Sequence, residues 1–254
     1  MDSKLKKQLT VYAEHYETSD FLPGDPSWFM HRAEGGDNQE TTAFIASCLS
    51  YGNRKLFMPK IQQLFDMAKG NLYQWISNGE YQVNIPDSDV TFYRLQTYHH
   101  IHRLFDGLHS LFQTHRTLGA FLQAKGVTTA MEAIEVITQY FASWDVGHLI
   151  PHTAASSCKR ICMFLRWMVR DHSPVDLGLW PFIDKRTLLM PLDTHVLQEA
   201  IRLNLIRNKS TTMKTVIALT KELKKFFPDD PLKGDFALFG YGMQQTKQTQ
   251  GHDG

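Results

Sequence analysis

The 254-residue sequence predicts an all-α fold. Most of its segments repeat apolar residues at the three- and four-residue spacing of amphipathic helices. Little of the chain alternates with the two-residue period of a strand. One stretch, residues 42–51, is apolar on almost every side and predicts a helix buried in the core.

The individual elements follow from these patterns and from local start and stop signals. In the first half we expect helices at 4–18, 42–51, 55–68, 73–76, 98–115 and 129–144, with a loop at 77–88. Asp37, with Glu40 three residues later, has the composition of a helix start, and Gly52 can end the buried helix. In the second half we expect one helix at 158–170, a second that starts at Asp193, a third that ends at Phe226 and a fourth at 232–243.

Composition limits the class of protein. Hydrophobic residues at 43% and charged residues at 21% are ordinary for a globular protein, and the length suits one compact unit or two small lobes. The longest apolar runs fall short of a membrane span, and the N-terminus has no signal-peptide pattern, so we expect a cytoplasmic protein with no membrane partner. Residues 246–254 are polar and predict a disordered tail.

Cysteine and histidine spacing argues against a metal site. Three cysteines without paired spacing are too few for a disulfide framework or a zinc site, and they predict small buried hydrophobes. His99, His100, His102 and His109 would point in different directions from one helix, so we expect a mostly exposed polar face there. We therefore expect no metal and no cofactor.

Charge is distributed unevenly along the chain. Residues 1–150 carry 12 Lys and Arg against 16 Asp and Glu, whereas residues 151–254 carry 15 against 10. Residues 201–225 include seven basic residues and one acidic residue. Such a balance can be a solvated helical face, but it also suits contact with a phosphate backbone.

Asp193 stands at the predicted start of a helix. It follows an extended Pro-Leu pair and precedes an apolar-periodic run, which predicts that its carboxylate is the N-cap. The simplest interpretation is that it only satisfies free amides of the first turn.

The surrounding motif adds a second interpretation. Residues 191–196, Pro-Leu-Asp-Thr-His-Val, resemble the Pro-Val-Asp-Thr-His-Val signature of the helix-hairpin-helix DNA glycosylase superfamily. A lysine-bearing helix at Lys159 and the sequence Asp-Phe-Ala-Leu-Phe-Gly-Tyr-Gly at 235–242 occur in the order expected for that superfamily. The whole chain also resembles an uncharacterised bacterial family known only as a domain of unknown function, on Asp-Pro-Ser-Trp-Phe at 25–29, on 159–170 and on 191–196.

The superfamily pattern that is most similar is the archaeal 8-oxoguanine glycosylase type, which implies a role for four residues. Lys159 would attack the sugar C1′ and form a Schiff base, and Asp193 would stabilise the positive charge that develops on the sugar. Asp235 would bind the edge of the flipped base, and Phe239 would stack on it or wall its pocket.

Further candidates are assigned more weakly. For the base pocket they are Tyr51, Asn53 and Met163, and for DNA contact they are Arg160, Arg54, His195 and Arg166. Residues 51, 53 and 54 also suit ordinary turn chemistry, and Lys159 alone would suit a solvated charge at a helix start.

The resemblance implies two helical lobes of the helix-hairpin-helix glycosylase type with a cleft between them. We expect one structural unit, residues 1–254, with a central lobe at 37–150 and a second lobe formed by 1–36 with 151–245. The implied function is a monomeric base-excision DNA glycosylase that acts on double-stranded DNA containing an oxidised purine such as 8-oxoguanine, with AP-lyase activity left open.

Two alternatives belong to other classes. A non-catalytic nucleic-acid-binding module on the same scaffold would bind in a salt-dependent way without product, with Lys159 and Asp193 far apart or pointing away from a cleft. A helical protein-interaction scaffold would bind no DNA at low salt.

Overall fold

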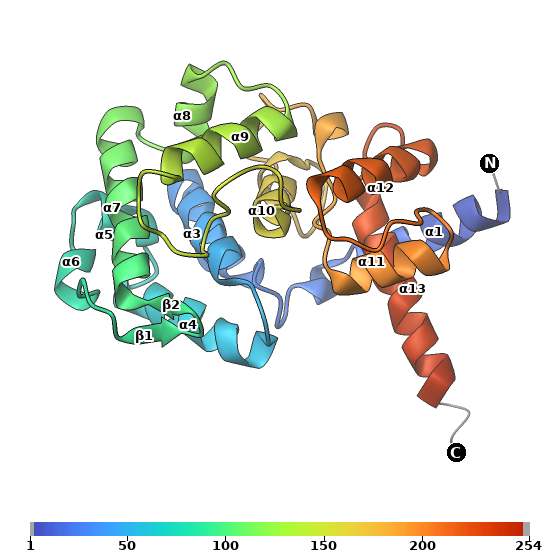
Figure 1. Cartoon of the computed structure of the whole chain (residues 1–254), viewed down its shortest axis with the longest axis horizontal. Coiled ribbons are helices and arrows are strands. Elements are labelled where there is room, and N and C mark those ends of the chain that lie inside the picture. Colours follow the sequence, from blue (N-terminus) through green and yellow to red (C-terminus); the bar gives the residue numbers. More distant parts are fainter. Residues whose placement is uncertain (1–2, 251–254) are drawn as a thin grey trace.

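The computed structural model describes residues 3–250, and its fold is all-α apart from one small hairpin (Figure 1). The first half contains α1 (Ser3–Tyr16), the 3-10 helix η1 (Ser19–Phe21), α2 (Trp28–Arg32), α3 (Gly36–Leu49), α4 (Arg54–Met67), α5 (Leu72–Ser77), α6 (Tyr81–Asn84), β1 (Thr91–Tyr93), β2 (Gln96–Thr97), α7 (Tyr98–His115) and α8 (Leu118–Ala124). The second half contains α9 (Ala130–Phe141), α10 (Lys159–Val169), η2 (Lys185–Thr187), α11 (Thr194–Arg202), α12 (Met213–Phe226) and α13 (Lys233–Gln250). The all-α prediction is therefore confirmed.

Helix α3 is the centre of the core, as its apolar composition predicts. It is buried along nearly its whole length and packs against α2 and α10. The ring of Phe44 lies 5.7 Å from that of Phe141 on α9 and 5.1 Å from that of Phe164 on α10. Because α10 packs directly on this buried helix, its first residues are held firmly in place.

The start of α3 differs from the prediction. The helix begins at Gly36, six positions before residue 42, and Asp37 and Glu40 lie inside it. Glu40 is buried, and its carboxylate accepts hydrogen bonds from Trp180 Nε1 at 2.8 Å and Gly119 N at 3.1 Å. Glu40, which has the position of a helix-start residue in the sequence, instead bonds to residues far away in the chain. Local spacing does not reveal these contacts.

Strands β1 and β2 and helices α6 and α8 were not predicted. Strands β1 and β2 pair antiparallel, α6 lies within the expected loop, and α8 fills a segment that had no assignment. Helix α8 has a threonine cap, because Thr117 accepts a hydrogen bond from Ala120 N at 3.1 Å. These elements are too short for a periodic pattern to develop.

The first and last helices of the chain lie together. Helix α1 packs along α13, and both lie at the same end of the molecule (Figure 1). Gly240 permits this approach, since a Cβ there would lie 2.4 Å from the Tyr16 ring. Helix α13 continues to Gln250 through the first part of the expected tail, whose residues 251–254 lie outside the described residues. Gln and Lys are good helix formers, so the polar sequence does not end the helix.

The histidines of α7 are not the mostly exposed face that was expected. His99 contacts Asp87 and Asp145, and His102 and His109 contact the carbonyls of residues 85 and 76. Each of these three histidines thus has a partner outside α7, which ties α7 to the segments beside it. Between residues 3 and 250, no helix combines the length and the apolar character needed to cross a bilayer.

Candidate active site

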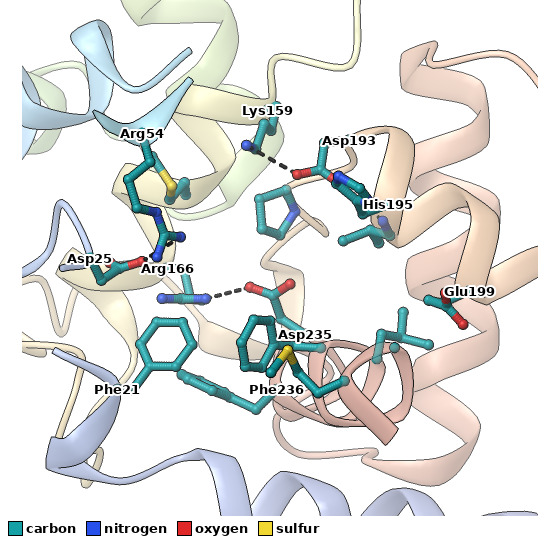
Figure 2. Close-up of a pocket in the computed structure, with 17 residues that line it drawn as sticks. Phe21, Asp25, Arg54, Lys159, Arg166, Asp193, His195, Glu199, Asp235 and Phe236 are labelled. Atoms are coloured by element: carbon teal, nitrogen blue, oxygen red, sulfur yellow. Dashed lines mark hydrogen bonds and ion pairs between the residues drawn. The ribbon is translucent and has the colours of Figure 1, made fainter. Parts of the chain in front are cut away.

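A cavity of about 410 Å³ lies between α10, α11, α13, the segment around η1 and the start of α4 (Figure 2). Eight of the eleven candidate residues line it, and they are Lys159, Asp193, Asp235, Phe239, Met163, Arg54, His195 and Arg166. These residues come from segments far apart in the chain. Their convergence could not be read from spacing alone.

Lys159 and Asp193 meet in this cavity. Lys159 Nζ lies 3.2 Å from Asp193 Oδ2, and Figure 2 shows the two side chains pointing toward one another. The Lys159 side chain is 35% exposed and that of Asp193 is 34% exposed, so a ligand in the cavity can reach both. This contact is the geometry that the catalytic interpretation requires.

The helix starts position both groups. Asp193 is the N-cap of α11, as predicted, and its Oδ1 accepts a hydrogen bond from Val196 N at 2.9 Å. The other carboxylate oxygen is thereby directed toward Lys159. Lys159 is the first residue of α10 and follows Cys158, whose φ of +45° turns the chain sharply into the helix.

Arg160 points away from Lys159 into the protein. Its guanidinium donates to the carbonyl of Cys48 at 2.6 Å and to that of His148, and it lies 5.1 Å from the centre of the Tyr51 ring. Burial lowers the pKa of Arg160 from its ordinary value. These contacts do not support Arg160 as a DNA contact, because its donors already join α3 to the loop before α10.

Arg166 is also not placed to contact DNA. Its side chain is 5% exposed, and Arg166 Nε lies 3.2 Å from Asp176 Oδ1 while Nη1 binds Asp235 Oδ2 (Figure 2). Burial raises the pKa of the Asp235 carboxyl above its ordinary value, and Arg166 opposes that shift. The sequence prediction for Arg166 is therefore corrected: it holds Asp235 at the cavity wall.

A buried ionic network supports this wall from behind. Arg170 Nη1 lies 2.5 Å from Asp176 Oδ2, and Arg170 Nη2 binds Asp230 at 2.9 Å and Glu17 at 2.7 Å. Both arginines lie over the Phe236 ring, with Cζ to centroid distances of 4.8 Å for Arg166 and 5.5 Å for Arg170. The network joins α10, α13 and the N-terminal segment, so the cavity floor is rigid.

An aromatic wall closes one side. Phe239 is 41% exposed, and its ring packs edge-on against Tyr16 at 5.5 Å and Phe21 at 5.3 Å. Phe21 also meets Phe236 at 5.3 Å. An exposed phenylalanine held by two other rings offers a rigid apolar surface to a ligand.

Sequence reasoning missed the N-terminal contribution. Phe21 and Asp25 line the cavity, and Asp25 lies 3.5 Å from Arg54. Asp25 Oδ1 also accepts a hydrogen bond from Ser27 N at 3.0 Å. No local signal shows that this segment meets α13, because the contact arises only from the packing of α1 on α13.

Two base-pocket candidates lie outside the residues that line the cavity. Asn53 caps α4 by accepting from Lys55 N at 2.9 Å, which is the turn chemistry considered as the alternative. Tyr51 exchanges hydrogen bonds with Tyr93, and burial raises the pKa of the Tyr51 hydroxyl. Neither residue lines the cavity.

The residues that the structure describes contain no cluster of three or more His, Cys, Asp or Glu side chains able to hold a metal ion. The cavity instead offers an amine beside a carboxylate, a second carboxylate held by an arginine, and an aromatic face. Such a set can form an imine with a sugar aldehyde and bind a planar polar ring.

Neither the curated protein sequences nor the solved structures contain a significant match. Residues 25–244 match the family described as "Protein of unknown function (DUF2400)", and the chain belongs to that family.

Proposed function

We propose that this protein is a base-excision DNA glycosylase that releases an oxidised purine through a lysine Schiff base. The observation that carries the proposal is the 3.2 Å contact between Lys159 Nζ and Asp193 Oδ2 inside a cavity that also contains Asp235 and Phe239. A non-catalytic module predicts that Lys159 and Asp193 lie apart, so their contact favours the enzyme.

The chemistry uses the two groups in sequence. Lys159 Nζ gives a proton to Asp193, and its lone pair forms a bond to the sugar C1′ while the C1′–N bond to the base breaks. The bonding electron pair leaves with the base, which takes up the proton that Asp193 received, so Asp193 is again a carboxylate. The C1′–O4′ bond then breaks, O4′ keeps that electron pair and takes up a proton from the attached nitrogen, and the nitrogen lone pair forms the C=N bond of the protonated imine. The Asp193 carboxylate stabilises the positive charge on the reacting carbon and nitrogen.

The cavity suits an extruded base. Its volume of about 410 Å³ lies within the range of about 300–1,000 Å³ typical of small-ligand sites. Asp235 presents a carboxylate that accepts hydrogen bonds from ring N–H or amino groups, and Phe239 presents an apolar face for stacking. An 8-oxopurine offers such N–H donors and a planar ring.

In this proposal the DNA lies across the mouth of the cavity, between the two helical lobes of the glycosylase type. The exposed guanidinium of Arg54 and the side chain of His195 line the opening and are available to phosphate oxygens. The basic balance of residues 151–254 adds a favourable field for the backbone.

Excision on an 8-oxoguanine duplex, measured by release of the base and by strand incision, tests the proposal. Asp193→Asn keeps an N-cap of similar quality but removes the charge, so we expect correct folding with about a hundredfold slower excision. The matched control is Asp184→Asn, because Asp184 is also an N-cap, accepts from Arg186 N and pairs with that arginine outside the cavity. Excision by Asp193→Asn at the rate of the unaltered protein, or no release of any oxidised purine by the unaltered protein, would contradict the proposal.

A further inference from the structure

A second cavity, of about 310 Å³, lies at the start of α3. It is formed by the first turns of α3, by α8 with the residues just before it, and by the segment that carries Leu179 and Trp180. None of the described residues lines both this cavity and the candidate active site. We call it the Glu40 cavity, after the buried carboxylate in its lining. Its volume lies within the range of about 300–1,000 Å³ typical of small-ligand sites.

The Glu40 carboxylate still has room for a hydrogen-bond donor from the cavity. Glu40 is 6% exposed, and its two oxygens accept from Gly119 N at 3.1 Å and from Trp180 Nε1 at 2.8 Å. The backbone amide of Leu118 adds a hydrogen bond that lowers the pKa of Glu40. A carboxylate has about four acceptor sites, so at least one remains for a ligand.

The cavity does not supply Glu40 with a counter-ion. The donors from Leu118, Gly119 and Trp180 are neutral, and the arginine of the lining, Arg116, pairs through Nε with Asp37 Oδ2 at 2.8 Å. Burial raises the pKa of Glu40 to about 7, and the charge of Asp37 adds to the rise. A buried carboxylate without a cation is costly, so a ligand that brings a positive charge would offset part of this cost.

The lining favours one kind of cation. The described residues contain no group of three or more His, Cys, Asp or Glu side chains able to hold a metal ion, which leaves an organic cation. Both oxygens of Glu40 already accept a hydrogen bond, which disfavours the two-pronged pairing of a guanidinium. An ammonium is a compact point charge that needs one free acceptor site. Ala120, Leu179 and Trp180 offer apolar surface to the carbon chain that carries it.

We propose that the Glu40 cavity binds a small primary amine, with the ammonium group on the Glu40 carboxylate and the carbon chain against Ala120, Leu179 and Trp180. This inference does not rest on the proposed function, because the two cavities have separate linings. An ammonium favours the ionised form of Glu40, so the amine competes with a proton for this carboxylate.

The groups that face Glu40 leave this competition visible. Asp37 raises the pKa of Arg116, so Arg116 keeps its charge between pH 6 and pH 8. Burial raises the pKa of Tyr73, whose hydroxyl stays neutral in the same interval. With a pKa of about 7, Glu40 itself is mostly protonated at pH 6 and mostly ionised at pH 8.

Titration calorimetry of the full chain with n-butylammonium chloride tests the proposal. We expect binding about tenfold tighter at pH 8 than at pH 6, because the ionised fraction of a group with a pKa of about 7 changes by about tenfold. At pH 6, comparison of two buffers should show the release of nearly one proton for each amine bound. The uncharged n-butanol should bind at least about tenfold more weakly than the amine at pH 8.

Two alanine substitutions on α8 locate the binding. Ala120→Leu fills the cavity and leaves Glu40 unaltered, so butylammonium should bind at least about tenfold more weakly. The matched control is Ala124→Leu, one turn later at an exposed position outside the lining, and it should bind as the unaltered protein does. Glu40→Gln, checked for folding by circular dichroism, should lose the preference for butylammonium over butanol.

Three results would overturn the proposal. They are no binding of butylammonium to the unaltered protein at pH 8, equal affinities at pH 6 and pH 8, and equal affinities for Ala120→Leu and the unaltered protein. The first two require no variant, so the proposal can be refuted even where Glu40→Gln does not fold.

Discussion

Replacing Arg166 by methionine tests whether this arginine supports the cavity wall or binds DNA. The substitution keeps the length and apolar stem of the side chain and removes the partner of Asp176 and Asp235. Asp176 still pairs with Arg170 in this variant. Asp235, whose pKa is already raised by burial, is left without the cation that opposes this shift. Breaking a buried pair by removing one partner costs about 3–5 kcal/mol.

The matched control is Arg103→Met. Arg103 also bridges two aspartates, Asp87 and Asp106, each at 2.9 Å, but its side chain is 38% exposed against 5% for Arg166. Exposed pairs contribute about 0.2–1 kcal/mol. In chemical denaturation, Arg166→Met should therefore lose several times more free energy of unfolding than Arg103→Met.

The loss in Arg166→Met should depend on pH. Without its cation, the folded-state pKa of Asp235 rises further above its unfolded value, so the folded protein binds more protons in that interval. Stability then falls as pH rises through the interval, and the penalty is largest at pH 8 and smaller near pH 5. Equal losses in the two variants, or a loss for Arg166→Met confined to salt-dependent DNA affinity, would refute the assignment.

Three further predictions concern stability and ligand contact. Gly119→Ala would place a Cβ 2.9 Å from the buried Glu40 carboxylate and should destabilise the protein by about 1–3 kcal/mol in thermal unfolding, whereas Gly36→Ala, which meets no atom within 4 Å, should not. Burial raises the pKa of Glu40 to about 7, so unfolding free energy should fall by up to about 3 kcal/mol between pH 4.5 and 7; a Glu40→Gln variant with the same pH slope would contradict this. Phe239→Ala should slow excision and lower the free energy of unfolding by less than about 1 kcal/mol. Phe236 is buried, so Phe236→Ala should lower the free energy of unfolding in denaturant by about 3–5 kcal/mol. A larger loss of stability for Phe239→Ala than for Phe236→Ala would refute the role of Phe239 as an exposed wall of the cavity.

Much of the helical fold could be predicted because its helices are long and periodic. Residues 98–115 were predicted as a helix with the observed bounds, and Asp193 caps α11 as its sequence context indicates. The hairpin, α6 and α8 could not be predicted in this way, because elements of two to seven residues are stabilised mainly by tertiary contacts.

The candidate site could be predicted only in part. The motif around Asp193 and the resemblance it carries identify Lys159, Asp235 and Phe239, all of which line one cavity. A charged residue's environment is not a local property, however. Arg166 has the same sequence character as a surface arginine, yet it packs against α13 and is buried.

The N-terminal segment also reaches the site through long-range packing. Phe21 and Asp25 enter the site because α1 packs on α13, and neither lies in a motif that would indicate it. Long-range packing decided the places of Phe21, Asp25 and Arg166, whereas Asn53 has the local capping role that was considered as its alternative.

Borohydride trapping on a duplex containing a single 8-oxoguanine, with an abasic-site duplex alongside, tests whether Lys159 forms a Schiff base with the sugar. The control is Lys185→Gln, because Lys185 has the same 35% exposure as Lys159, pairs with Asp171 at 2.5 Å and lies outside the cavity. We predict a covalent protein–DNA adduct that Lys159→Gln abolishes and Lys185→Gln retains. An adduct that persists in Lys159→Gln, or none with the unaltered protein on either duplex, would contradict it.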